Sequence, residues 1–247
     1  MPETARYLLK RLLNEKKNHT PDGIYAALQI DMAYQSNRIE GSGLSKELVI
    51  SMFQKHSISG NNIRVDDVIE ALNHFRCLDF LLDHYAQPVT EKQVKHYHKL
   101  LKQGTFDADS PAAAVGQYKK YANMVGDMET VSPEKTAAEM QKLVAEYQAL
   151  ADPKLDDLLA FHAAFEKIHP FYDGNGRVGR LILFQQCLQT DVLPFIIEND
   201  YKEYYYRGLR EWQMGGEKGY LRDTCLLMQD HAKALLSRYG IPYNMTN

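Results

Sequence analysis

The chain has 247 residues, 45% hydrophobic and 25% charged, which is the composition of an ordinary globular protein. Lys and Arg number 29 against 32 Asp and Glu, so the net charge of −3 gives no general attraction to nucleic acid or anionic membranes. No stretch resembles a signal peptide or approaches 18 apolar residues, and we expect neither a membrane nor a nucleic acid as partner. Cys77, Cys187 and Cys225 lie far apart, as buried thiols of a reducing compartment do. We therefore expect a cytoplasmic protein.

Apolar residues recur at helical spacing along almost the whole chain. Short turn-forming segments such as HTPDG, AQPVT and LADPK separate the helical stretches. The pattern predicts helices over residues 4–16, 22–40, 45–57, 65–85, 90–103, 134–150, 154–168, 176–189, 200–214 and 218–239. The sequence thus predicts an all-α, or mainly α, fold in a single domain spanning 1–247.

One segment, AVGQYKKYANMVGDMETVSPEK, departs from the helical pattern. Its Val, Tyr, Met and Gly residues alternate at strand-like spacing, and Gly126 and Asp127 are placed as a turn. We predict a short β-hairpin over about 115–131. Because a lone hairpin is only marginally stable, it must pack on the helices or cover something. An inert surface hairpin is the alternative.

The stretch HPFYDGNGRVGR, residues 169–180, separates two predicted helices. A plain helix-to-helix turn needs one glycine. Here Gly174 and Gly176 leave backbone N–H groups bare where a helix begins, and such a terminus binds anions. Arg177 and Arg180 lie three residues apart on one helix face and could hold successive phosphates. The stretch therefore indicates a polyphosphate site.

Three other residues of this stretch carry suitable chemistry. His169 could take a proton from a hydroxyl nucleophile. Asp173 is an oxygen ligand suited to Mg²⁺, and the Asn175 amide could donate to a phosphate. The alternative is a capped helix pair in which each of these residues makes local contacts only.

This stretch resembles the Fic signature, H-x-F-x-[D/E]-G-N-G-R-x-x-R, at every fixed position. Most Fic proteins transfer AMP from ATP to a hydroxyl side chain of a target protein. The resemblance implies a Fic-type helical bundle with ATP as substrate and Mg²⁺ as cofactor. It makes His169 the base and Asp173 the metal ligand, with Arg177 on the β-phosphate and Arg180 on the γ-phosphate. The anion hole would consist of Gly174, Asn175 and Gly176.

The hairpin is similar to the Fic flap, which holds the nucleotide and pairs with an extended segment of the target. The resemblance implies nucleotide contacts from Val125, Gly126, Asp127 and Met128. It also implies contacts to adenine from Tyr205, Tyr206 and Gln213, although a tyrosine run on a helix is more often core packing than a ligand contact. The expected partner is a target protein docked on the flap, and self-modification is a further expectation.

A second motif lies upstream, in the helix predicted near 22–41. SNRIEG, residues 36–41, is similar to the Fic inhibitory motif [S/T]-x-x-x-E-[G/N]. Ser36 and Glu40 are one turn apart and share a helix face. The resemblance implies that Glu40 pairs with Arg180 and keeps it from the γ-phosphate, as in the class with N-terminal inhibition.

The leading hypothesis is an autoinhibited protein adenylyltransferase that releases pyrophosphate. Removal of AMP from a modified target is one alternative. A weakly catalytic nucleotide-binding regulatory module is another. Ser, Thr or Tyr as acceptor and the oligomeric state, with a homodimer among the options, stay open.

Overall fold

The structure is a computed structural model that describes residues 3–126, 128–190 and 192–243. Within these ranges it contains ten α-helices and one two-stranded sheet, which confirms the predicted mainly α-helical fold. The helices are α1 (Glu3–Asn18), α2 (Ile24–Ile39), α3 (Lys46–Lys55), α4 (Val65–His84), α5 (Glu91–Lys102), α6 (Pro133–Gln148), α7 (Leu155–Ile168), α8 (Asn175–Gln189), α9 (Lys202–Gln213) and α10 (Gly219–Arg238). A 3₁₀ turn, Asn199–Tyr201, precedes α9. Every predicted helix is present, with ends within two residues of the prediction. Each helix in the described ranges is too short or too polar to cross a lipid bilayer.

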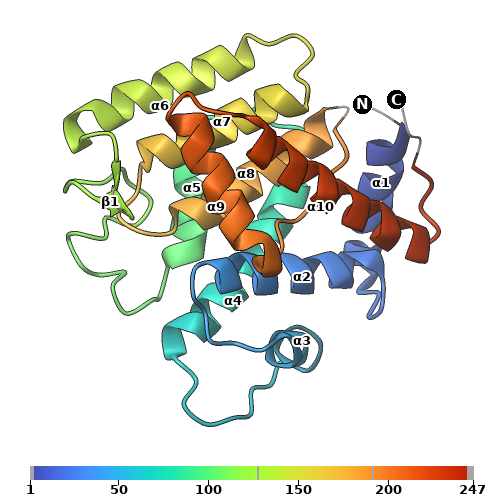
Figure 1. The fold of residues 1–247 in the computed structure, drawn as a ribbon. Helices are drawn as coiled ribbons and strands as arrows, with labels where there is room; N and C mark the ends of the chain where they lie inside the picture. Colours follow the sequence, from blue (N-terminus) through green and yellow to red (C-terminus); the bar gives the residue numbers. More distant parts are fainter. Residues whose placement is uncertain (1–2, 127, 191, 244–247) are drawn as a thin grey trace.

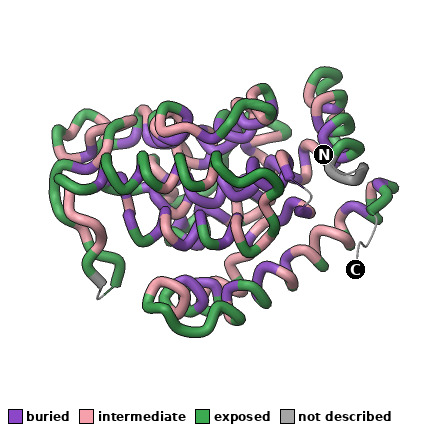
Figure 2. Tube along the Cα trace, turned by 90° about the horizontal axis from the view of Figure 1, so that it is seen from above, coloured by how far each residue is buried: buried purple, intermediate pink, exposed green. Residues whose placement is uncertain are grey.

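Helix α8 is the centre of the packing. It contacts α7, α5, α2 and α4, and nearly all of its residues are buried (Figure 1). Its apolar residues Val178, Leu181, Phe184 and Leu188 are buried in the core, and its polar residues Arg177, Arg180, Gln185 and Gln186 are buried with them. Figure 2 shows buried residues concentrated in the interior of the molecule. The N-terminus of α8 is therefore fixed in position by the packing of the rest of this core helix.

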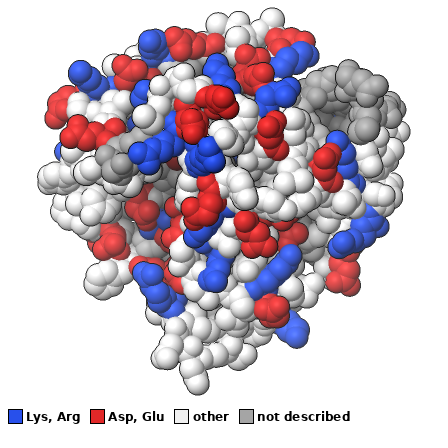
Figure 3. All heavy atoms as spheres, in the orientation of Figure 1, with Lys and Arg blue, Asp and Glu red and all other residues white. Residues whose placement is uncertain are grey.

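Helix α2 crosses this core and packs on α4, α3, α1 and α8. Ile24, Leu28 and Met32 are buried along its length. This packing carries the last turn of α2, with Ser36, to the side of α8. On the face drawn in Figure 3, cations and anions are intermixed, in keeping with the small net charge.

The predicted hairpin is present but has a short ladder. Strand β1 (Met124–Val125) pairs antiparallel with β2 (Met128–Glu129), with Val125 opposite Met128, and Gly126 lies in a turn, where the sequence predicted one. Val125 is 38% exposed, and Gly126 is exposed beside it. Asp127 lies outside the described residues, and Met128 is described for its backbone alone.

Gly208 lies where α9 crosses the start of α10. A Cβ there would lie 2.5 Å from the backbone nitrogen of Leu221 and 2.6 Å from its Cα. Gly208→Ala is expected to push the helices apart and to lower the unfolding free energy by about 1–3 kcal/mol. Thermal unfolding would record this as a Tm lower by several degrees. Gly219→Ala is the matched control, because a Cβ at this exposed position would meet no atom closer than 3.9 Å. A Gly208→Ala variant as stable as the control would contradict the close approach.

Candidate active site

The loop between α7 and α8 brings the predicted catalytic residues together. α7 ends at Ile168, because His169 is left-handed (φ 50°) and Pro170 cannot continue the helix. Gly174 is the N-cap of α8, and its φ of 81° favours glycine. Since Gly174 offers no capping side chain, the first N–H groups of α8 remain available to an anion.

Asn175 holds this loop closed. Its Oδ1 accepts from the Phe171 backbone N–H at 2.8 Å, and its Nδ2 donates to the Phe171 carbonyl at 2.9 Å. The sequence led us to expect that this amide would contact phosphate. In the structure the side chain is 1% exposed and is used up inside the turn, because the buried Phe171 N–H needs an acceptor. Asn175 thus shapes the loop at the start of α8.

Asn175→Ala is expected to lower the unfolding free energy by about 1–3 kcal/mol, the cost of an unpaired buried N–H. The Phe171 carbonyl keeps the Asn123 amide at 2.9 Å, so the loss comes mainly from the Phe171 N–H. Urea unfolding measures it beside Tyr172→Ala, a control in the same loop at a position 47% exposed. The control should change by less than about 0.5 kcal/mol. Equal effects of the two substitutions would contradict this role of Asn175.

His169 is held as a neutral imidazole with one nitrogen available. Its Nδ1 lies 3.3 Å from the Glu166 carbonyl oxygen, which can only accept, so Nδ1 carries the proton and Nε2 keeps its lone pair. Burial lowers the pKa of His169 to about 4, so the ring is uncharged at neutral pH. Burial also raises the pKa of the Glu166 carboxyl, 4.0 Å from Nδ1, to about 8. In this setting His169 Nε2 can act as a proton acceptor.

Arg180 meets the end of α2. Its Nε donates to Ser36 Oγ at 3.0 Å, and its Nη2 donates to the Ser36 carbonyl at 3.0 Å and to Glu40 Oε1 at 2.7 Å. The Arg180 side chain is 6% exposed and that of Glu40 28%, so the ion pair lies at the edge of the interior. The fold therefore brings together three residues from two distant parts of the sequence.

Glu40 also lies against the first turn of α8. A Cβ built on Gly176 would overlap Glu40 Oε1 and would lie 2.9 Å from Arg180 Nη1, so both groups lie directly against the Gly176 backbone. Among the described residues, Arg180 Nη1 is buried and has no hydrogen-bond partner. An unpaired guanidinium N–H beside a helix N-terminus suits an anion. Glu40 places the protein's own carboxylate next to that position.

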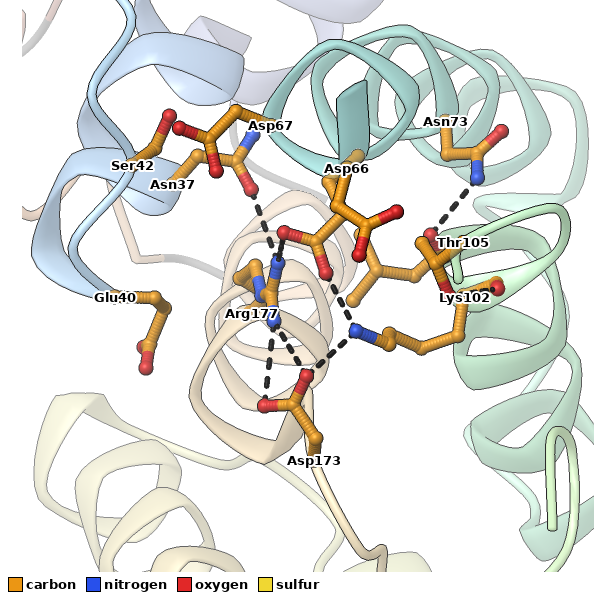
Figure 4. A network of polar contacts seen from close by, with 12 residues as sticks. Asn37, Glu40, Ser42, Asp66, Asp67, Asn73, Lys102, Thr105, Asp173 and Arg177 are labelled. Atoms are coloured by element: carbon orange, nitrogen blue, oxygen red, sulfur yellow. Dashed lines mark hydrogen bonds and ion pairs between the residues drawn. The ribbon is translucent and has the colours of Figure 1, made fainter. Parts of the chain in front are cut away.

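Asp173 and Arg177 flank the loop on another side. Arg177 Nη2 lies 3.2 and 3.4 Å from the two Asp173 oxygens, and its Nη1 pairs with Glu70 of α4. Lys102 Nζ, from the end of α5, lies 2.6 Å from Asp173 Oδ2. Figure 4 shows Lys102 and Arg177 pointing toward Asp173 from two sides. Although burial opposes ionisation, the charges of Arg177 and Lys102 hold the pKa of Asp173 well below its usual range. The sequence pattern did not single out Glu70 or Lys102.

Asp173 has the surroundings of a magnesium ligand. Its side chain is 52% exposed, and the contact of its Oδ1 with Arg177 Nη2 is long, at 3.4 Å. Mg²⁺ usually takes one or two protein carboxylates and completes its shell with phosphate and water oxygens. Within the described residues no three His, Cys, Asp or Glu side chains gather as metal ligands. A metal at Asp173 would therefore take most of its ligands from phosphates and water.

The root of the hairpin is fastened to the loop. The Lys119 backbone N–H donates to the Pro170 carbonyl at 2.8 Å, and Lys119 Nζ donates to the Ile168 carbonyl at 3.1 Å. Asn123 Nδ2 donates to the Phe171 carbonyl. Lys119 is 3% exposed, and burial lowers its pKa to about 8. The sequence pattern indicated neither of these two connections.

Tyr205 does not face an open base pocket. Its side chain is 1% exposed, and its hydroxyl lies 2.6 Å from His162 Nε2. Its ring centroid lies 6.0 Å from the Arg180 guanidinium. The inner face of α9 packs on α7, so Tyr205 is a core residue. This agrees with the alternative interpretation of the tyrosine run as core packing. From the interior, Tyr205 supports Arg180.

Tyr206 and Gln213 lie closer to the surface. Tyr206 is 39% exposed, and its hydroxyl donates to the Ile39 carbonyl at 3.4 Å, at the end of α2. Gln213 Nε2 donates to the Ala163 carbonyl of α7 at 3.0 Å. Both residues therefore remain candidates for contacts to a base.

Comparison with known proteins gives these residues a family context. Residues 88–187 match the Fic/DOC family, a range that includes the loop but neither Glu40 nor Glu70. A probable protein adenylyltransferase of Aquifex aeolicus is 44% identical over 57 residues, 23% of this chain and 17% of the relative. The protein adenylyltransferase fic-1 of Caenorhabditis briggsae is 22% identical over 214 residues, 83% of this chain and 40% of the relative. The chain spans less than half the length of these curated relatives.

The fold has solved counterparts. A Fic domain containing signaling protein of Bacteroides thetaiotaomicron has a TM-score of 0.70 at 22% identity, covering 94% of both chains. Fic-1 of Caenorhabditis elegans has a TM-score of 0.67 at 17% identity, covering 96% of this chain and 73% of that one. These structures show that the chain has the fold of Fic proteins, and residues 88–187, with the intact loop, carry the match to the Fic/DOC family.

Proposed function

We propose that this chain is a protein adenylyltransferase inhibited by its own Glu40. It transfers AMP from ATP to a hydroxyl side chain of a target protein and releases pyrophosphate. The observation that carries the proposal is one short loop that sets a neutral base, His169, beside a helix N-terminus flanked by Arg177 and Arg180. Relatives named protein adenylyltransferases support the same activity.

The chemistry follows from this arrangement. The target hydroxyl oxygen attacks the α-phosphorus, the bond from that phosphorus to the oxygen bridging to the β-phosphate breaks, and pyrophosphate leaves. The hydroxyl proton goes to His169 Nε2. The first N–H groups of α8 and Arg177 stabilise the charge that develops on the phosphate oxygens. Asp173 would hold Mg²⁺, which when bound neutralises phosphate charge and orients the α- and β-phosphates.

Inhibition follows from the position of Glu40. Its carboxylate holds Arg180 Nη2 at 2.7 Å and stands against Gly176. The γ-phosphate and Glu40 compete for the same guanidinium, so ATP that enters while Glu40 is in place binds in a pose that leaves the α-phosphate misaligned. A charge-assisted contact of about 1–3 kcal/mol is enough for strong suppression.

We further propose that the target docks along the hairpin. Met124 and Val125 are 59% and 38% exposed, and a sheet of two short strands offers its edge to an extended segment. Lys119 and Asn123 hold the root of the hairpin to the loop. A strand added there would present its hydroxyl toward His169.

The test incubates the chain with a cell lysate, Mg²⁺ and ATP labelled on either the α- or the γ-phosphate. Wild type, Glu40→Gly and His169→Ala are compared. We expect α-label, but no γ-label, on protein, strongest with Glu40→Gly and absent with His169→Ala. Transfer of γ-label would mean phosphate transfer. Loss of AMP from prelabelled protein without any gain would favour the AMP-removing alternative. Tight ATP binding without label in any variant would favour the regulatory module.

A further inference from the structure

Four side chains beside the loop form a closed ring of alternating charge. Arg177 pairs with Glu70 and with Asp173, at 3.2 Å from Asp173 Oδ2. Lys102 Nζ closes the ring, at 2.5 Å from Glu70 Oε1 and 2.6 Å from Asp173 Oδ2. Glu70 and Lys102 come from α4 and α5, so the ring joins three core helices and the loop. Figure 4 labels Lys102, Asp173 and Arg177 of this ring.

The ring is mostly buried. The side chains of Arg177, Lys102 and Glu70 are 4, 10 and 12% exposed, whereas that of Asp173 is 52% exposed. Charges removed from water must be balanced locally, and here two cations face two anions. Adding the Arg180–Glu40 pair gives three cations against three anions, so the site offers phosphates no net positive charge.

Lys102 lies at the anion-binding end of α8. A Cβ built on Gly174, the N-cap of α8, would lie 3.5 Å from Lys102 Cδ. The ammonium has three donors, two of which are used on Glu70 and Asp173. Arg177 Nε is likewise buried without a partner among the described residues. Lys102 therefore has a third ammonium donor next to the helix N-terminus, and Arg177, in the first turn of α8, has an Nε–H that is unpaired within the described ranges.

We propose that Lys102 is a further phosphate-binding residue of this site, and that Glu70 competes with the polyphosphate of ATP for Lys102 and Arg177. This inference rests on the proposed function, because it assumes that phosphates bind at the start of α8. Glu70 acts on Arg177 and Lys102 as Glu40 acts on Arg180. A polyphosphate that reaches the loop replaces the Glu70 carboxylate as the anion between the two cations.

The proposal makes opposite predictions for two substitutions. Glu70→Gln keeps the shape of the side chain and leaves the ring with one extra positive charge, so ATP affinity should rise by about 10-fold. Lys102→Met removes a phosphate contact and leaves an extra negative charge, so ATP affinity should fall by about 10-fold or more. The double variant restores neutrality and should bind ATP more tightly than Lys102→Met alone. Residues that only support the fold would weaken binding in both single variants.

Calorimetry with ATP measures these affinities for the full chain, with Mg²⁺ and with EDTA, after thermal unfolding has shown that each variant is folded. Lys99→Met is the matched control, because it removes the same charge from an exposed position one turn earlier on α5 and should leave ATP affinity unchanged. Loss of affinity in both Glu70→Gln and Lys102→Met would overturn the proposal. A higher ATP affinity of Lys102→Met in Mg²⁺ but not in EDTA would also overturn it, because this result would mean that Lys102 competes with the metal for Asp173.

The assay reads binding and not transfer, so it separates the two proposals. If affinities change as expected while no α-label reaches protein, the proposed function alone fails. If no variant binds ATP at all, both proposals fail together.

Discussion

His169→Ala is expected to lower the rate of AMP transfer by at least about 100-fold and to leave the affinity for ATP near that of wild type. In the proposed mechanism Nε2 acts on the incoming hydroxyl, whereas α8 and the arginines bind the phosphates. The measurement is label transfer from α-labelled ATP in a Glu40→Gly background, with calorimetric affinities beside it. His56→Ala, at an exposed position, is the matched control. A variant that keeps more than about a tenth of the rate would remove His169 as the base.

The pKa of His169 also sets the pH below which the transfer rate is expected to fall. Burial places the pKa of His169 at about 4, below its ordinary value of 6.5, so the neutral form that accepts a proton predominates above about pH 4. Transfer should therefore persist at pH 5–6, where an exposed histidine base would already be losing activity. A fall in rate at pH 6.5 would mean that His169 is solvated when the target is bound.

Glu40→Gly is expected to raise the transfer rate by about 10- to 100-fold, because it frees a charge-assisted contact of about 1.4–3 kcal/mol on Arg180. Self-modification or labelling of a lysate protein measures the rate. Glu40→Gln separates charge from shape, since the amide keeps the length of the side chain but is a weaker partner for the guanidinium. It should give an intermediate rate. Glu47→Gly, at an exposed position in the first turn of α3, should leave the rate unchanged.

A double substitution tests whether Arg180 is the target of this restraint. Arg180→Ala should be poorly active with or without Glu40, so the two changes cannot be additive. Ser36→Ala removes the acceptor of Arg180 Nε, at 3.0 Å, but leaves Glu40 in place, and we expect it to stay inhibited. If Arg180→Ala with Glu40→Gly is as fast as Glu40→Gly alone, Glu40 inhibits through some other group.

The sequence predicts the helices and the loop because their signals are local. Apolar periodicity and short turn-forming segments locate α1 to α10 within two residues, and the pair of glycines before two arginines indicates an anion site at a helix start. The contact of Glu40 with Arg180 came from the resemblance, since Ser-x-x-x-Glu on a helix has no chemistry of its own. The structure brings the two side chains together.

The remaining contacts depend on tertiary packing. Glu70 is one of several acids on α4, and Lys102 is a cation in the last turn of α5, where a lysine normally only offsets the helix dipole. Nothing local distinguishes them from solvated residues. A weak signal was available at α4, which carries buried Asp67, Asn73 and His74 among its apolar residues. Tyr205 shows the opposite: its residue type suggested a contact to adenine, but the side chain is buried in the core.

Because Glu40 is the C-cap of a core helix, the inhibition that we propose can be relieved by a movement of its side chain alone. What moves is one side chain, 28% exposed, and such rotamer changes take picoseconds to nanoseconds. Turnover is typically slower by many orders of magnitude, at about 1–10³ s⁻¹. We therefore expect the proposed blocked and open forms to exchange many times during each catalytic cycle. Basal activity is then the fraction of time that Glu40 spends away from Arg180, and progress curves should start without a lag. A ligand that contacts the exposed edge of Glu40 would raise or lower the activity gradually, by changing this fraction.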